Sequence, residues 1–226
     1  MLIHNKIYFS ERCGIKPTPI IGGSEAAPYS IPWQVALVTR VFPNCGGTLI
    51  SNQHVLTAAH CVHNINGTQT VGFVLVGEHS FLDNFNGSHI DGTRYDTCRV
   101  QTHPQWDNET LNNDFAVVTL TQPVEMWARV NYACLPTSEL KGDFLAGKNM
   151  TASGWGIGAN QSRPWNLYTV DLPVVSNTEC NLWFSVLFGF PAITDRMLCA
   201  GLESENAVGV CFGDSGGKIR NSPDSV

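Results

Sequence analysis

Short runs rich in β-branched and aromatic residues recur along the chain, and clusters of Gly, Asn and Pro separate them. A series of such runs at short spacing is typical of strands and predicts an all-β barrel or sandwich. One helix signal interrupts the series, because Ser176 and Glu179 form the pattern of a capping box and an apolar run begins at Leu182. The six runs that we predict as strands are residues 33–38, 54–58, 71–76, 115–120, 150–155 and 167–175.

Composition excludes several functional classes. Of the 226 residues, 43% are hydrophobic and only 14% are charged, which excludes a disordered polyelectrolyte and suits one globular domain. The formal net charge is −6, so the chain lacks the basic character of proteins that bind nucleic acid or anionic lipid. The longest apolar run, residues 182–193, is too short to span a membrane and contains Gly189 and Pro191. We therefore expect neither a nucleic-acid nor a membrane partner.

The cysteines indicate an oxidising compartment. The chain has eight cysteines and no Cys-x-x-Cys motif, a pattern that favours a disulfide framework over a zinc site. Five N-glycosylation sequons point the same way, although sequons also arise by chance. The first thirteen residues lack the apolar segment of a signal peptide. We still predict a secreted, extracellular glycoprotein, with its sequons at Asn66, Asn86, Asn108, Asn149 and Asn160.

Three short motifs carry side chains that could take part in catalysis. His60 stands beside a cysteine after an apolar run, Asp114 precedes an apolar run, and Ser215 lies in the sequence Phe-Gly-Asp-Ser-Gly-Gly. Taken singly, each has a simpler interpretation: a solvated or structural histidine, a turn aspartate, and a plain Gly-rich turn. Glycines on both sides of a serine also let backbone N–H groups converge on a small space, as an oxyanion hole requires.

Together with further motifs, these residues resemble the trypsin/chymotrypsin family of serine proteases. They stand in that family's order, His then Asp then Ser, and the resemblance extends from about Cys13 to Gly217. It implies an all-β fold of two six-stranded antiparallel Greek-key β-barrels, the first in residues 20–125 and the second, incomplete at its C-terminus, in residues 126–226. The further motifs are Ile20-Ile21-Gly22-Gly23, Pro32-Trp33-Gln34-Val35, Cys45-Gly46-Gly47-Thr48-Leu49-Ile50 and Gly154-Trp155-Gly156.

The resemblance implies a serine endopeptidase. Ser215 would attack the scissile carbonyl, His60 would accept its proton and pass it to the leaving amine, and Asp114 would hold the imidazole in the useful tautomer. The N–H groups of Gly213 and Ser215 would bind the oxyanion. Protein or peptide substrates, an activating protease, protein inhibitors and a monomeric state are also implied. This chemistry needs no metal and no organic cofactor.

The resemblance further implies activation by cleavage before Ile20. Residues 1–19 would form a propeptide-like segment, and the new α-amino group of Ile20 would pair with Asp214 and order the oxyanion hole. The sequence departs from the family here, because Pro19 stands where a basic residue is usual and Lys16 is followed by proline. A trypsin-like activator is therefore not expected to cut at this bond.

Substrate preference is expected from the base of the primary pocket. In the family's pattern that position falls on Gly209, followed by Val210, with Phe212 at the pocket mouth. Tryptic members carry an aspartate at the base. Without a carboxylate there, the resemblance implies cleavage after apolar residues rather than after Arg or Lys.

The family's disulfide pattern is only partly present. The resemblance implies pairs between Cys45 and Cys61, Cys180 and Cys199, and Cys13 and Cys134, and leaves Cys98 and Cys211 without assigned partners.

The family also continues well beyond the nucleophile, with strands that complete the second barrel, whereas this sequence ends at Val226. We therefore expect a C-terminally truncated relative of the family. The alternative function is a catalytically silent homologue that acts as a binding or regulatory protein. A metal site is the last alternative: oxygen donors between Glu78 and Asp91 would suit calcium, but solvated loop polarity is the simpler interpretation.

Overall fold

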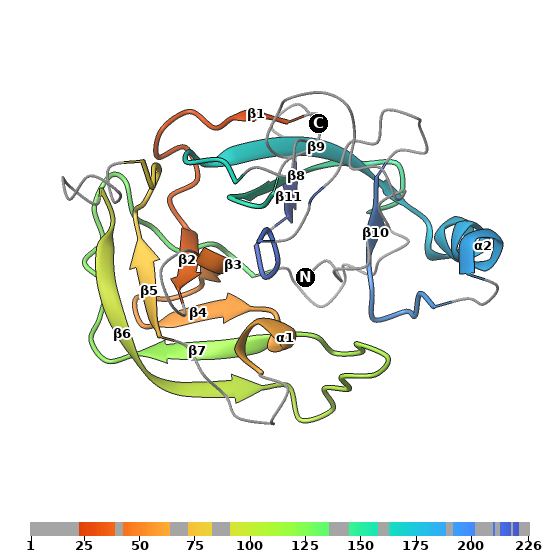
Figure 1. The fold of residues 1–226 in the computed structure, drawn as a ribbon, viewed down its shortest axis with the longest axis horizontal. Helices are drawn as coiled ribbons and strands as arrows, with labels where there is room; N and C mark the ends of the chain where they lie inside the picture. Colours follow the sequence, from red (N-terminus) through yellow and green to blue (C-terminus); the bar gives the residue numbers. More distant parts are fainter. Residues whose placement is uncertain are drawn as a thin grey trace.

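The fold is built almost entirely from short antiparallel strands. The computed structural model describes residues 23–38, 43–63, 72–82, 91–135, 145–157, 163–188, 192–201, 210, 213–217 and 219–221. Within these residues it contains eleven strands and two helices (Figure 1). No helix in this part of the chain is long and apolar enough to cross a membrane.

The first half of the chain closes into a barrel. Its strands follow the order β2-β3-β4-β7-β6-β5, and every neighbouring pair is antiparallel. Alternate residues of β2, such as Val35 and Leu37, point inward and are almost fully buried in the barrel's core, as the two-residue period of a strand requires. The strands are β2 (Gln34–Val38), β3 (Pro43–Leu49), β4 (His54–Thr57), β5 (Phe73–Val76), β6 (Thr93–Thr102) and β7 (Ala116–Leu120).

The second half forms a sheet that does not close within the described residues. Its strand order is β1-β9-β8-β11, and β10 pairs with β9. Its core is centred on apolar residues of β8 and β9, including Leu172, which is completely buried. The prediction of an all-β chain with an incomplete second barrel is therefore confirmed. The strands are β1 (Ser24–Glu25), β8 (Asn149–Gly154), β9 (Tyr168–Val175), β10 (Cys199–Ala200) and β11 (Ile219–Asn221).

A third apolar cluster joins the two halves. Trp155, which follows β8, packs edge-on against Phe81 with ring centroids 5.4 Å apart. Its indole N–H donates to the carbonyl oxygen of His79 across the junction, with the two atoms 3.2 Å apart. Because Ala36 and Val38 of β2 belong to the same cluster, the second half covers the outer face of the barrel at β2.

All six predicted strands are present, and so is the helix. Helix α2 (Asn177–Phe188) begins after Ser176, whose Oγ accepts a hydrogen bond from the N–H of Glu179 at 3.2 Å, as the capping box predicts. The elements that were not predicted are β3, β6, the short strands β1, β10 and β11, and the single-turn helix α1 (Ala59–Val62). Strand β6 escaped notice because most of its side chains are polar and exposed, and Tyr95 is its one fully buried residue.

Two of the predicted disulfides are formed. Cys45 pairs with Cys61, and Cys180 pairs with Cys199. Cys134 is an exposed free thiol, and its predicted partner Cys13 lies outside the described residues, so that pair stays a prediction. Cys98 is also an exposed free thiol, and Cys211 lies outside the described residues.

Candidate active site

His60 and Asp114 form a close hydrogen-bonded pair. The carboxylate of Asp114 accepts from His60 twice: Oδ2 lies 2.6 Å from the ring nitrogen Nδ1, and Oδ1 lies 2.9 Å from the backbone nitrogen. An ionised carboxylate can only accept, so the proton of the neutral imidazole belongs on Nδ1. The pair therefore fixes both the orientation and the tautomer of the ring, and Nε2 becomes its basic nitrogen.

The barrel's register brings the pair together. Thr57, the last residue of β4, pairs with Ala116, the first residue of β7. His60 follows β4 in helix α1, and Asp114 precedes β7, so the adjacent strand ends place both at one rim of the barrel (Figure 1). Asp114 is buried, with 7% of its surface exposed, whereas 28% of the His60 side chain is exposed. The ring is thus anchored in the protein on one side and open to solvent on the other.

Ser215 lies in a tight turn that docks against the barrel. Gly213 and Gly216 have φ values of 102° and 76°, a backbone conformation that residues with a Cβ rarely adopt. The carbonyl oxygen of Ser215 accepts a hydrogen bond from the N–H of Gly46 at 2.7 Å. A Cβ on Gly216 would collide with the Thr57 hydroxyl and with the carbonyl oxygen of Gly46. The Ser215 turn therefore packs directly on the end of β4, the strand that leads to His60.

Asp214 is buried beneath this turn. Its Oδ1 accepts a hydrogen bond from the N–H of Gly156 at 2.7 Å. A side chain on Gly154 or Gly156 would overlap the Asp214 carboxylate, so both glycines are needed to make room for it. Ile20, the predicted partner of Asp214, lies outside the described residues.

The predicted pocket residues are only partly described. Gly209 and Phe212 lie outside the described residues. Val210 is buried in the core of the second sheet, beside residues such as Leu172 and Ala200.

One cluster has the composition of a metal site but not its chemistry. Ligand atoms of Cys45, His60 and Cys61 lie within 4.8 Å of one another. The two cysteines form a disulfide, however, so neither can supply the thiolate that a metal ion would need. The disulfide instead anchors helix α1, and with it His60, to β3.

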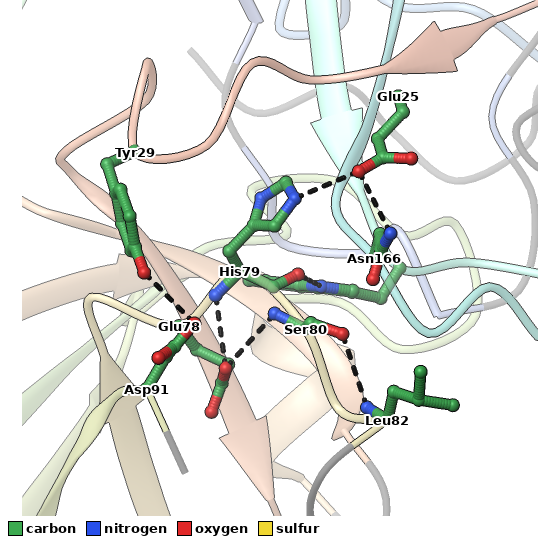
Figure 2. Close-up of polar contacts among 9 residues, drawn as sticks. Glu25, Tyr29, Glu78, His79, Ser80, Leu82, Asp91 and Asn166 are labelled. Atoms are coloured by element: carbon green, nitrogen blue, oxygen red, sulfur yellow. Dashed lines mark hydrogen bonds and ion pairs between the residues drawn. The ribbon is translucent and has the colours of Figure 1, made fainter. Parts of the chain in front are cut away.

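A polar cluster surrounds the buried Glu78, which follows β5 (Figure 2). Glu78 is only 4% exposed, and its Oε1 accepts hydrogen bonds from the backbone N–H groups of His79 and Ser80, both at 3.1 Å. Its Oε2 is buried without a hydrogen-bond partner among the described residues. Nearby, the Tyr29 hydroxyl donates to Oδ2 of Asp91 at 2.9 Å.

Burial raises the pKa of Glu78 to about 7, even though hydrogen bonds from nearby backbone N–H groups act in the opposite direction. The interpretation of this stretch as solvated loop polarity is therefore wrong for Glu78. Glu78 follows the apolar strand β5 after a single glycine, and this proximity is the sequence signal of its burial.

Comparisons with known proteins give the family of the chain. The sequence model of the Trypsin family matches residues 20–222. The chain is 35% identical over 222 residues to the clotting factor G beta subunit of Tachypleus tridentatus, covering 92% of this chain and 68% of that protein. It is 33% identical over 210 residues to chymotrypsin-C of Mus musculus, covering 88% and 71%, respectively. It is also 33% identical over 214 residues to serine proteinase stubble of Drosophila melanogaster, covering 90% and 26%.

The closed antiparallel barrel and the incomplete second sheet are consistent with the chymotrypsin fold. The chain belongs to the trypsin family. Membership of this family, together with relatives that are named as proteases, supports a serine protease function with protein substrates.

Proposed function

We propose that the chain is a serine endopeptidase in which Ser215, His60 and Asp114 act as a catalytic triad. The observation that carries the proposal is the double hydrogen bond from His60 to Asp114, at 2.6 Å and 2.9 Å. The contact with Nδ1 orients the ring and keeps Nε2 basic, and the contact with the backbone N–H fixes the carboxylate beside it, as a general base and its partner require.

The chemistry proceeds in two steps. Ser215 Oγ attacks the carbonyl carbon of the scissile bond while His60 Nε2 takes its proton. The tetrahedral intermediate then breaks its C–N bond, and His60 returns the proton to the leaving amine. Water next attacks the acyl-enzyme in the same way, releasing the new carboxylate and restoring the serine. The buried Asp114 stabilises the imidazolium that forms twice in this cycle.

Oxyanion stabilisation falls to the backbone N–H groups of Gly213 and Ser215. The positive φ of Gly213 supports this role, because such a backbone turns successive N–H groups toward one side. A single donor of this kind is worth about 2.7–4 kcal/mol in comparable enzymes. We further propose activation through an Ile20 ammonium paired with buried Asp214, so that residues 1–19 act as an activation segment and residues 20–226 as the peptidase domain.

Two finer proposals concern specificity and location. Preference for apolar side chains rests on Gly209, where no carboxylate is present to bind Arg or Lys. Secretion and glycosylation are supported by the two disulfides and by the exposure of the sequon residues Asn108 and Asn149. The alternative of a silent binding protein is not favoured, because the His60–Asp114 pair is intact and the relatives are named as proteases.

Labelling with a fluorophosphonate tests the proposal directly, because the reagent reacts with an activated serine and needs little of the substrate cleft. We expect the secreted chain to be labelled at Ser215 and the Ser215→Ala variant not to be labelled. Asp114→Asn should fold but label far more slowly. A wild-type chain that stays unlabelled after release of the Ile20 amine would overturn the triad. A peptide panel cleaved preferentially after Arg would overturn only the apolar preference.

A further inference from the structure

A buried hydrogen bond joins the two halves of the molecule directly beneath the Ser215 turn. The hydroxyl of Ser153, on β8, donates to Oε1 of Gln34, on β2, with the two oxygens 2.8 Å apart. Both residues are buried, with 5% and 2% of their surfaces exposed. Their strand neighbours Val35 and Ala152 face the two apolar cores. Because side chains alternate along a strand, Gln34 and Ser153 point away from those cores and toward each other.

This pair lies against the glycines that hold the turn in place. A Cβ on Gly46 would come within 3.0 Å of the Gln34 amide nitrogen and within 3.3 Å of Gly217. A Cβ on Gly217 would lie 2.8 Å from the carbonyl oxygen of Ser153. Gln34 therefore packs under Gly46, and Ser153 packs under Gly217, with no space left between them.

Gly46 connects this contact to both proposed catalytic side chains. Its N–H donates to the carbonyl oxygen of Ser215 at 2.7 Å, and its own carbonyl oxygen accepts from the hydroxyl of Thr57 at 2.8 Å. Thr57 ends the strand that leads to His60. A shift of the second sheet relative to the barrel would move Ser215 against Gly46, and the geometry between Ser215 and His60 would change with it.

We propose that Gln34 and Ser153 are positioning residues, whose hydrogen bond sets the separation of the two halves and so aligns Ser215 with His60. Neither residue touches the substrate in this proposal. A buried glutamine–serine pair gives a directional, fixed-length contact, which apolar packing between the halves does not provide. The inference rests on the proposed triad, since alignment matters only if Ser215 is the nucleophile.

A matched control is available on the same strand. Thr151 lies on β8 two residues before Ser153, is 6% exposed, and donates its hydroxyl to Oδ1 of Asp171 at 2.5 Å. Asp171 is its cross-strand neighbour on β9, within the second sheet. Thr151→Val therefore removes a hydrogen bond between a buried hydroxyl of the same strand and an exposed carboxylate, and it leaves the hydrogen bond between the halves in place.

The test compares kcat, normalised to titrated active sites, and KM for a short apolar peptide. We expect Ser153→Ala to lower kcat about tenfold while KM changes less than about twofold, because misplacement of about 1 Å can cost up to about 10²-fold. Ser153→Thr, which keeps the hydroxyl, should restore kcat. Thr151→Val should lower stability but leave kcat within about twofold.

The double variant Gln34→Met/Ser153→Ala separates alignment from stability. Removing both partners leaves no unsatisfied buried group, so stability should recover relative to Gln34→Met alone. The alignment is still lost, so kcat should stay low. If kcat follows stability in this series, or if Ser153→Ala behaves like Thr151→Val, the positioning role is wrong while the triad stands. A wild-type chain that a fluorophosphonate does not label would overturn both.

Discussion

Replacing Glu78 with glutamine should remove a large pH dependence of stability. The carboxyl group of Glu78 is buried, and this raises its pKa to about 7 from an ordinary value of 4.5. Between pH 4.5 and 7, Glu78 therefore keeps its proton in the folded chain but has lost it in the unfolded chain. In this window the folded state binds more protons, so the free energy of unfolding falls as pH rises.

The magnitude follows from the two pKa values. Each pH unit between them corresponds to about 1.4 kcal/mol, so Glu78 should lower the free energy of unfolding by at most about 3 kcal/mol between pH 4.5 and 7. Glutamine keeps the shape of the side chain but carries no charge. Glu78→Gln should therefore match the wild type at pH 4.5 and exceed it by up to about 3 kcal/mol above pH 7.

The assay is equilibrium urea unfolding followed by tryptophan fluorescence, with disulfides intact and a chelator present so that no metal ion masks the titration. Other groups face Glu78, including His79, Asp91 and Tyr29, with Arg129 stacked on the Tyr29 ring. Groups that do not interact with Glu78 contribute equally to variant and wild type, so they drop out of the difference.

The matched control for this assay is Glu25→Gln. It changes a half-exposed carboxylate that hydrogen-bonds His79 at 3.2 Å in the same cluster (Figure 2). It should leave the slope between pH 4.5 and 7 intact. A difference between Glu78→Gln and the wild type that stays constant with pH would refute the reasoning.

Three further changes have defined outcomes. Asp114→Asn should lower kcat by about 10⁴-fold, because the neutral amide no longer holds the imidazole in the useful tautomer, with KM for a short peptide nearly unchanged, as steady-state kinetics would show. Gly216→Ala should destabilise the chain and abolish fluorophosphonate labelling. The added Cβ would collide with Thr57 and Gly46, and the φ of 76° at this position disfavours alanine. Normal labelling would contradict the packing described. Replacing Cys45 and Cys61 by alanine should lower the free energy of unfolding by about 2–5 kcal/mol and reduce labelling as well, because this disulfide anchors the helix that carries His60; unchanged labelling would show that α1 holds His60 without it.

Much of the site could be predicted because its parts are short local motifs. Ser215 needs glycines on both sides for its turn, and these are visible in the sequence. The capping box at Ser176 likewise marks the start of α2, because the cap is a contact between residues only three positions apart. Local patterns such as these survive in a single sequence without any knowledge of the rest of the fold.

Other features could not be predicted, because they depend on contacts between distant segments. Gln34 and Ser153 are 119 residues apart, and nothing local distinguishes either from an exposed polar residue in a strand. Strand β6 pairs through its backbone with β5 and β7, while its side chains carry little hydrophobic signal. Glu78 follows an apolar strand, but an acidic residue at such a strand end is usually solvated, so the packing around it decides that it is buried.

The proposed catalytic residues come from both halves of the chain. His60 and Asp114 belong to one barrel and are fixed to each other by its register, so their geometry tolerates movement between the two halves. Ser215 comes from the second half of the chain and reaches the barrel through Gly46. A movement between the two halves therefore changes the distance between Ser215 and His60 more than the distance between His60 and Asp114. Substitutions at the junction should affect turnover more than equally destabilising substitutions within either core.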